Sequence, residues 1–304
     1  MSALLSAADA AALEDLSLAA RLVVEGIRAG AHRSLRPGYS TEFRQHRPYQ
    51  QGDDLKHLDW KALARTDRLY TRQFRETTDM AALVVLDTSA SMGFPESGVS
   101  KFAYARVLAA ALTQLMTTAG DAVGLLTRRD ARWEFLPPRS GILHRRLMFS
   151  RLEAMAPGGI WEGPRVITRA AEMLSRRGLL IVLSDLYDDE APVQRALRVA
   201  RQHGHDVLLL QILSPQERAL PTSSARVLVD AETGARLEVD PAIARAAYAQ
   251  RFSAFLERCA RAAQRDAIEH AVCWTDTDPA QTLRRLLLQR HGRVHALDAR
   301  ASDD

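Results

Sequence analysis

The chain has 304 residues, enough for two domains or for one large α/β domain with an extension. Apolar residues make up 47% of the chain and charged residues 26%, so the composition excludes disordered, collagen-like and coiled-coil proteins. The longest apolar run, Met80 to Leu86, is far shorter than the roughly 18 residues that cross a bilayer. No basic segment follows Met1, so we expect no secretory signal and a cytoplasmic location.

The net charge of +4 is unevenly distributed. Residues 21–75 hold twelve Lys and Arg residues against six Asp and Glu residues. A basic block of this kind can bind nucleic acid, an acidic partner or an anionic membrane face, or its charges can pair within the fold. No recognised nucleic-acid-binding module accompanies the arginines, which makes nucleic-acid binding the weaker alternative.

The N-terminal quarter predicts one helix and little regular structure after it. Apolar residues recur every three or four positions from Leu13 to Ile27, which is typical of an amphipathic helix. Residues 31–66 are rich in Arg, His, Gly, Pro and Asp, so we expect an irregular segment with short strands. A further strand is predicted from Leu69 to Phe74.

From residue 79 onward the pattern alternates between strands and helices, which is typical of βαβ units. The prediction is an α/β fold with a mostly parallel central sheet flanked by helices, an N-terminal elaboration and a β-hairpin insertion at 215–240. The expected division is an N-terminal elaboration (1–78), an α/β domain (79–292) and a C-terminal tail (293–304). The expected strands are 81–86, 122–127, 133–136, 179–184, 206–213 and 271–274, and the expected helices are 101–118, 143–155, 165–176, 191–203, 241–265 and 279–289.

Oxygen-bearing side chains follow two of the predicted strands. Asp87, Ser89 and Ser91 come directly after the first strand of the sheet, and Asp185 follows the strand that ends at Ser184. Sites in such folds form at the carboxyl ends of strands, and hard oxygen donors suit Mg²⁺ or Mn²⁺. A second interpretation is that the hydroxyls cap the turn and that Asp87 accepts hydrogen bonds from local backbone amides.

The segment Val84–Met92 resembles the metal-ion-dependent adhesion motif DxSxS of von Willebrand factor A domains. Upstream residues resemble the signature of the bacterial family called domain of unknown function 58: Glu42-Phe43, Arg47-Pro48-Tyr49, Gly52-Asp53-Asp54, His57-Leu58-Asp59-Trp60 and Ala64-Arg65-Thr66. The resemblance covers roughly residues 20–290 and implies a Rossmann-like A domain with Asp87, Ser89, Ser91 and Asp185 as metal ligands.

One position departs from the family pattern. A domains supply a threonine from a Gly-Gly-Thr loop, and the matching segment here is Gly158-Gly159-Ile160. Because Ile160 has no side-chain oxygen, we expect Mg²⁺ or Mn²⁺ to be held weakly at this site.

A second group of residues lies in the arginine-rich block. Its charges can form a docking face for a partner or an ion-pair network that orders the segment, and the network is the favoured interpretation. Two tryptophans are further candidates: the one in this block is expected to be a packing anchor, and Trp161 is either a contact residue beside the strand ends or part of the core. The candidate partner-binding residues are Arg47, Asp53, Asp54, Asp59, Trp60, Arg65 and Trp161.

The resemblance implies a non-enzymatic adaptor or chaperone-like assembly factor that works with a MoxR-type AAA+ ATPase and an unidentified client protein. The chain contains no GxxxxGK[ST] motif, so ATP hydrolysis would belong to the partner. A metal-dependent phosphoryl-transfer hydrolase is the enzymatic alternative, because Asp87 after a parallel strand is similar to the DxDxT motif of haloacid dehalogenases. Ser89 stands where that motif has its second acid, which argues against catalysis.

Overall fold

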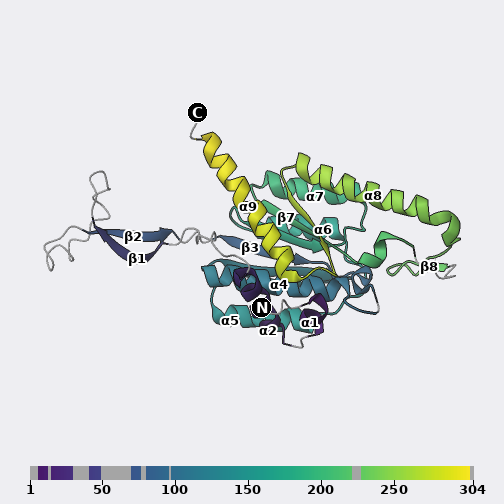
Figure 1. The fold of residues 1–304 in the computed structure, drawn as a ribbon, viewed down its shortest axis with the longest axis horizontal. Helices are drawn as coiled ribbons and strands as arrows, with labels where there is room; N and C mark the ends of the chain where they lie inside the picture. The colour runs from purple at the N-terminus through teal and green to yellow at the C-terminus, as the bar shows by residue number, and fades with distance from the viewer. Residues whose placement is uncertain are drawn as a thin grey trace.

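The computed structural model describes residues 6–12, 15–29, 41–48, 70–76, 80–95, 97–220 and 227–301. Figure 1 shows an α/β body with a separate N-terminal hairpin to one side. Among the described helices, none combines the length and the apolar character needed to cross a membrane.

The body is built on a six-stranded sheet in the order β10-β7-β6-β3-β4-β5. The pairs β10/β7, β7/β6, β6/β3 and β3/β4 are parallel, and β5 pairs with β4 in the antiparallel sense. This arrangement confirms the predicted mostly parallel sheet. The strands are β3 (Ala81–Leu86), β4 (Ala122–Arg129), β5 (Arg132–Arg139), β6 (Leu179–Ser184), β7 (Asp206–Leu213) and β10 (Glu269–Trp274).

The central strand β3 shows why the sheet is covered on both faces. Ala82, Val84 and Leu86 point into one apolar core, whereas Leu83 and Val85 point into a second core on the opposite face. Because side chains alternate along a strand, an unbroken apolar run requires a helical layer on each side.

Two helical layers meet this requirement (Figure 1). The first core is closed by α1 (Ala7–Ala12), α2 (Leu16–Ala29), α4 (Lys101–Ala119), α5 (Ile142–Ala154) and α9 (Pro279–Ala301). The second is closed by α6 (Gly163–Met173), α7 (Glu190–Gln202) and α8 (Pro241–Arg265). Helix α4 begins at Lys101 as predicted, and the Ser100 hydroxyl caps it by accepting a hydrogen bond from the Ala103 amide.

The N-terminal helix differs from the prediction. Instead of one helix from Leu13, the structure has α1 and then α2, which begins at Leu16. The predicted apolar stripe is nevertheless the buried one, because Leu16, Val23 and Ile27 are almost fully covered. The other end of the chain also differs, since α9 continues to Ala301 although we predicted its end at Gln289 and a tail from residue 293.

Two hairpins lie outside the six-stranded sheet. Strands β1 (Thr41–Pro48) and β2 (Tyr70–Glu76) pair in the antiparallel sense. Strands β8 (Val227–Val229) and β9 (Arg236–Glu238) form the predicted insertion hairpin. The predicted boundary between residues 78 and 79 falls outside the described residues.

The edge strand β5 has an irregular register. Val123 lies opposite Arg139 whereas Leu125 lies opposite Leu136, so the two residues Pro137 and Pro138 of β5 lie opposite the single residue Gly124 of β4. Gly124 sits against them, and a Cβ there would lie 2.6 Å from the carbonyl oxygen of Leu136. The glycine therefore permits the close approach that the irregular edge needs.

Burial lowers the pKa of His270, a histidine in the edge strand β10. His270 places its Nε2 3.0 Å from Oε1 of Gln211 in β7, and burial lowers its pKa to about 4. An unfolded histidine titrates near 6.5, so the unfolded chain binds this proton at a higher pH than the folded chain does. Stability associated with neutral His270 is complete above about pH 6.5 and declines as the pH falls toward 4.

We predict that His270→Gln reduces the loss of stability between pH 7 and pH 4.5 by up to about 3 kcal/mol. Denaturant unfolding at the two pH values measures this difference, with His203→Gln as the control because His203 is exposed at the end of α7. Equal acid sensitivity of the wild type and His270→Gln would contradict the prediction.

Candidate functional site

The predicted oxygen-bearing residues meet at one edge of the sheet. Strands β3 and β6 are parallel neighbours, with Leu86 opposite Leu183. The loop after β3 therefore lies beside the end of β6, and the Asp87 amide donates to the Leu183 carbonyl. We call Asp87, Ser89, Ser91, Ser184 and Asp185 the strand-end cluster.

Asp87 is bound by its own surroundings. Its Oδ1 accepts a hydrogen bond of 2.8 Å from the Ser89 amide, and its Oδ2 accepts one of 2.6 Å from the Ser184 hydroxyl. Burial, together with the nearby Asp185 carboxylate, raises the pKa of Asp87 well above its usual range. Of the two interpretations from sequence, local backbone hydrogen bonding is the one observed for this residue.

The side-chain oxygens of Ser89, Ser91 and Asp185 form a chain of contacts. Ser89 Oγ lies 3.0 Å from Ser91 Oγ, and Ser91 Oγ lies 2.7 Å from Asp185 Oδ2. Adjacent oxygens around a Mg²⁺ ion at 2.0 to 2.1 Å are separated by about 3 Å, so these spacings suit a shared ion. Ser89, Ser91 and Asp185 therefore fit a hard divalent cation and would be the residues that hold it.

The sequence interpretation missed two charged residues of the site, Lys101 and Glu217. Lys101 is the first residue of α4, and its ammonium contacts Asp185 Oδ2 at 2.8 Å and Glu217 Oε1 at 2.7 Å. The Lys101 and Asp185 side chains are only 1% and 2% exposed. The sequence did contain a signal for Lys101, which lies in the first turn of a predicted helix. A cation there is disfavoured by the helix dipole, so acidic partners are expected nearby.

Glu217 is held in place by a short turn before the insertion hairpin. It belongs to the 3₁₀ helix Pro215–Arg218, and its Oε2 accepts a hydrogen bond of 2.6 Å from the Ser214 amide. Its other oxygen faces Lys101, so one carboxylate both caps the turn and pairs with the buried ammonium. The carboxylates of Asp185 and Glu217 raise the pKa of Lys101 despite its burial, which keeps the side chain charged.

The glycine loop lies against the strand-end cluster but adds no side-chain oxygen. The Gly158 amide donates to the Thr88 carbonyl, and the Gly159 carbonyl accepts from the Ala90 amide. Gly159 has a φ of +73°, and a Cβ there would lie 2.3 Å from Asp130 Oδ1. The described residues contain no group of three or more His, Cys, Asp or Glu side chains placed to hold a metal, so hydroxyls would have to complete the site.

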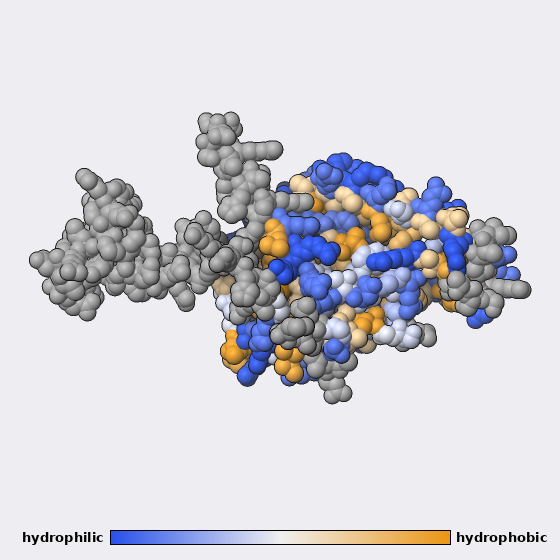
Figure 2. Space-filling model, viewed as in Figure 1, coloured by the Kyte–Doolittle hydropathy of each residue, from blue (hydrophilic) through white to orange (hydrophobic). Residues whose placement is uncertain are grey.

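Three large apolar side chains are exposed around the strand-end cluster. We call them the apolar rim: Phe94 (40% exposed), Ile160 (49%) and Tyr187 (45%). The Lys101 ammonium lies 4.7 Å from the ring centre of Tyr187 and 5.9 Å from that of Phe94. On the face seen in Figure 2, hydrophobic residues are scattered among hydrophilic ones. Exposed large apolar side chains also occur on α5 (Ile142, Leu143 and Leu147) and on the β8–β9 hairpin (Val227, Val229 and Leu237), so what singles out the apolar rim is its position beside the strand-end cluster.

Trp161 does not belong to this surface. It is 2% exposed and packs in the core beneath α6 and α7, so its predicted role as a contact residue is wrong and the core alternative is correct. Arg47 lies in β1, where the structure describes the backbone. The remaining candidates lie outside the described residues: Asp53, Asp54, Asp59, Trp60 and Arg65.

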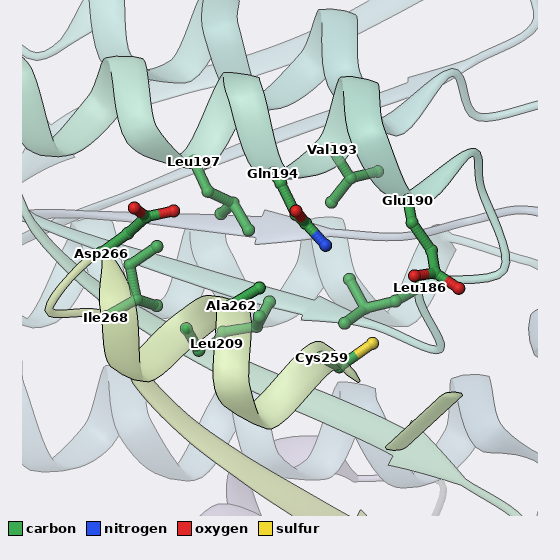
Figure 3. A pocket seen from close by; sticks show the side chains of 11 residues that line it. Leu186, Glu190, Val193, Gln194, Leu197, Leu209, Cys259, Ala262, Asp266 and Ile268 are labelled. Atoms are coloured by element: carbon green, nitrogen blue, oxygen red, sulfur yellow. The ribbon is translucent and has the colours of Figure 1, made fainter. Parts of the chain in front are cut away.

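A small cavity lies between α7 and α8 (Figure 3). Its lining is mainly apolar and includes Leu186, Val193 and Cys259. The cavity volume is about 30 Å³. Ligand pockets are typically about 300–1,000 Å³, so this space is a packing gap and not a binding site.

Similarity to known proteins places the chain in a family. The model of the family described as "Protein of unknown function DUF58" matches residues 45–257. The chain belongs to this family. Uncharacterised proteins of Mycobacterium bovis and Mycobacterium tuberculosis are 34% identical to it over 253 residues, which is 80% of this chain and 78% of theirs.

Two solved structures from Bacteroides are also similar to the chain. An aerotolerance-related membrane protein from Bacteroides fragilis is 17% identical, with a TM-score of 0.47, and the match covers 69% of this chain and 97% of that one. The protein BatB from Bacteroides thetaiotaomicron is 16% identical, with a TM-score of 0.47, and the match covers 69% of this chain and 98% of that one.

The contacts of Asp87 predict different effects for two substitutions. Asp87→Ala leaves the Ser184 hydroxyl and the Ser89 amide without their acceptor, which should lower the free energy of unfolding by about 2–4 kcal/mol. Asp87→Asn keeps one acceptor and carries no charge, like the protonated Asp87 that the raised pKa favours at neutral pH, so we expect a change within about 1 kcal/mol. Denaturant unfolding at neutral pH measures both values. If Asp87→Ala were as stable as the wild type, a structural role for this carboxylate would be wrong.

Proposed function

We propose that the protein is a non-enzymatic interaction module that captures a partner protein at the strand-end cluster. The observation that carries the proposal is the apolar rim, which lies beside a polar centre formed by Ser91 and Asp185. Protein interfaces commonly combine buried aromatic or aliphatic anchors with a few oriented polar groups. The half-buried Ser91 hydroxyl gives a partner polar access to the centre of the rim.

The polar centre suits an acidic group on the partner when a cation is present. Ser89, Ser91 and Asp185 would hold Mg²⁺ or Mn²⁺, and the bound ion supplies a coordination position for a carboxylate. The loop of Ile160 adds no oxygen, which is consistent with weak metal binding.

We propose a MoxR-type AAA+ ATPase, together with its client protein, as the partner. Support comes from membership of the DUF58 family, since proteins of the family that the sequence resembles often accompany such ATPases. The absence of a GxxxxGK[ST] motif assigns ATP hydrolysis to the partner. In this role the chain is an adaptor or chaperone-like assembly factor.

Co-expression with a MoxR-type ATPase from the same organism tests the proposal. We expect the two proteins to co-purify in the presence of nucleotide, and we expect Phe94→Ala/Ile160→Ala to reduce capture by at least about tenfold, since interface anchors each contribute more than about 1 kcal/mol. Failure of the wild-type pair to co-purify would contradict the ATPase partnership.

Leu143→Ala is the matched control for the rim variant. Leu143 is 76% exposed, but it lies in α5 on the first helical layer and not in the apolar rim. The control should retain the ATPase. Equal loss of capture in the control and the rim variant would place the docking surface elsewhere.

A further inference from the structure

The position of Lys101 is unusual for a charged side chain. Lysine is among the residues least often fully buried, and the first turn of a helix disfavours a cation. Lys101 occupies both environments, and its ammonium lies between the carboxylates of Asp185 and Glu217. Without these two carboxylates, its burial would be strongly unfavourable.

The ammonium uses the same carboxylate oxygen that a bound ion would use. Asp185 Oδ2 accepts hydrogen bonds from both Lys101 Nζ, at 2.8 Å, and the Ser91 hydroxyl, at 2.7 Å. The second oxygen of Asp185 accepts a hydrogen bond from the Tyr187 amide at 3.1 Å. A divalent cation that binds Ser91 and Asp185 must therefore share Oδ2 with a positive charge or displace it.

Lys101 also connects three separate parts of the fold. It begins α4, contacts the end of β6 through Asp185, and contacts the turn before the insertion hairpin through Glu217. A resident metal ion often links such elements in a site of this kind, because its ligands come from several loops. Here an ammonium of the chain itself makes the links.

We propose that Lys101 acts as a built-in cation of the strand-end cluster, which holds the cluster together without a metal ion and weakens its affinity for Mg²⁺ and Mn²⁺ through the shared Asp185 oxygen. The inference deepens the proposed function, because the same cluster would receive the partner. The inference concerns the isolated chain. Lys101 can therefore fail to act in this way while partner capture succeeds, and partner capture can fail while Lys101 acts as proposed.

The test is a titration of purified protein with Mn²⁺ by calorimetry, combined with thermal unfolding in chelator. The wild type should unfold at the same temperature, within about 1 °C, with and without chelator, because its stability does not depend on a ligand. Lys101→Met should unfold at a lower temperature in chelator and should bind Mn²⁺ at least about tenfold more tightly than the wild type does. Mn²⁺ should recover part of its lost thermal stability.

A double variant, Lys101→Met/Glu217→Gln, separates the contact from the net charge. It removes one positive and one negative group, so the formal charge of the cluster stays that of the wild type. Because the ammonium is gone from Asp185, we expect tighter Mn²⁺ binding than in the wild type. This variant also leaves fewer unpaired buried charges than Lys101→Met, so it serves if the single variant does not fold.

Three results would overturn the proposal. One is a wild-type chain that loses stability in chelator, because the ammonium would then not replace a metal. Another is that the folded variants bind Mn²⁺ with the same affinity as the wild type, or that neither they nor the wild type bind it at all. The third is a double variant that binds Mn²⁺ with the affinity of the wild type while Lys101→Met binds it more tightly. Net charge, and not the Lys101–Asp185 contact, would then set the affinity.

Discussion

The candidate site depends on a buried ammonium between two carboxylates. Lys101 could not stay buried in the first turn of α4 without the carboxylates of Asp185 and Glu217, which lie 2.8 Å and 2.7 Å from its ammonium. The three groups belong to elements that are distant in sequence, so their pairing fixes how α4, β6 and the turn of Glu217 meet. The strand-end cluster owes its geometry to this contact as much as to the sheet.

Much of the sheet follows from local sequence patterns. The apolar run that becomes β3 predicts a strand covered on both faces, and the alternation of strands and helices predicts parallel neighbours. The meeting of Asp87 with Ser184 then follows, because both residues end parallel strands. The pairing of Lys101 with Glu217 could not be predicted in this way, since the residues are 116 positions apart and no periodic pattern connects them. Trp161 was equally ambiguous, because a loop tryptophan after two glycines suits a surface or a core.

The residues of the predicted metal motif have different roles in the structure. Asp87 is committed to the Ser89 amide and the Ser184 hydroxyl, so its main contribution is to hold the loop after β3 in shape. The Ser91 hydroxyl is half-buried and donates to the buried Asp185 carboxylate, and Phe94, Ile160 and Tyr187 are exposed nearby. The motif therefore predicted that these side chains meet at one edge of the sheet, whereas the separate hydrogen-bonding roles of Asp87 and Ser91 became visible only in the structure.

The irregular edge of the sheet restricts how another protein can add to this fold. An exposed edge strand can recruit a further strand from a neighbouring chain, which leads to aggregation or to β-strand addition. Pro137 and Pro138 remove two backbone donors from β5, and the register shift beside Gly124 bends the ladder at the same point. Extension of the sheet past β5 is thus disfavoured, and the protein is protected at this edge from polymerising through its own backbone.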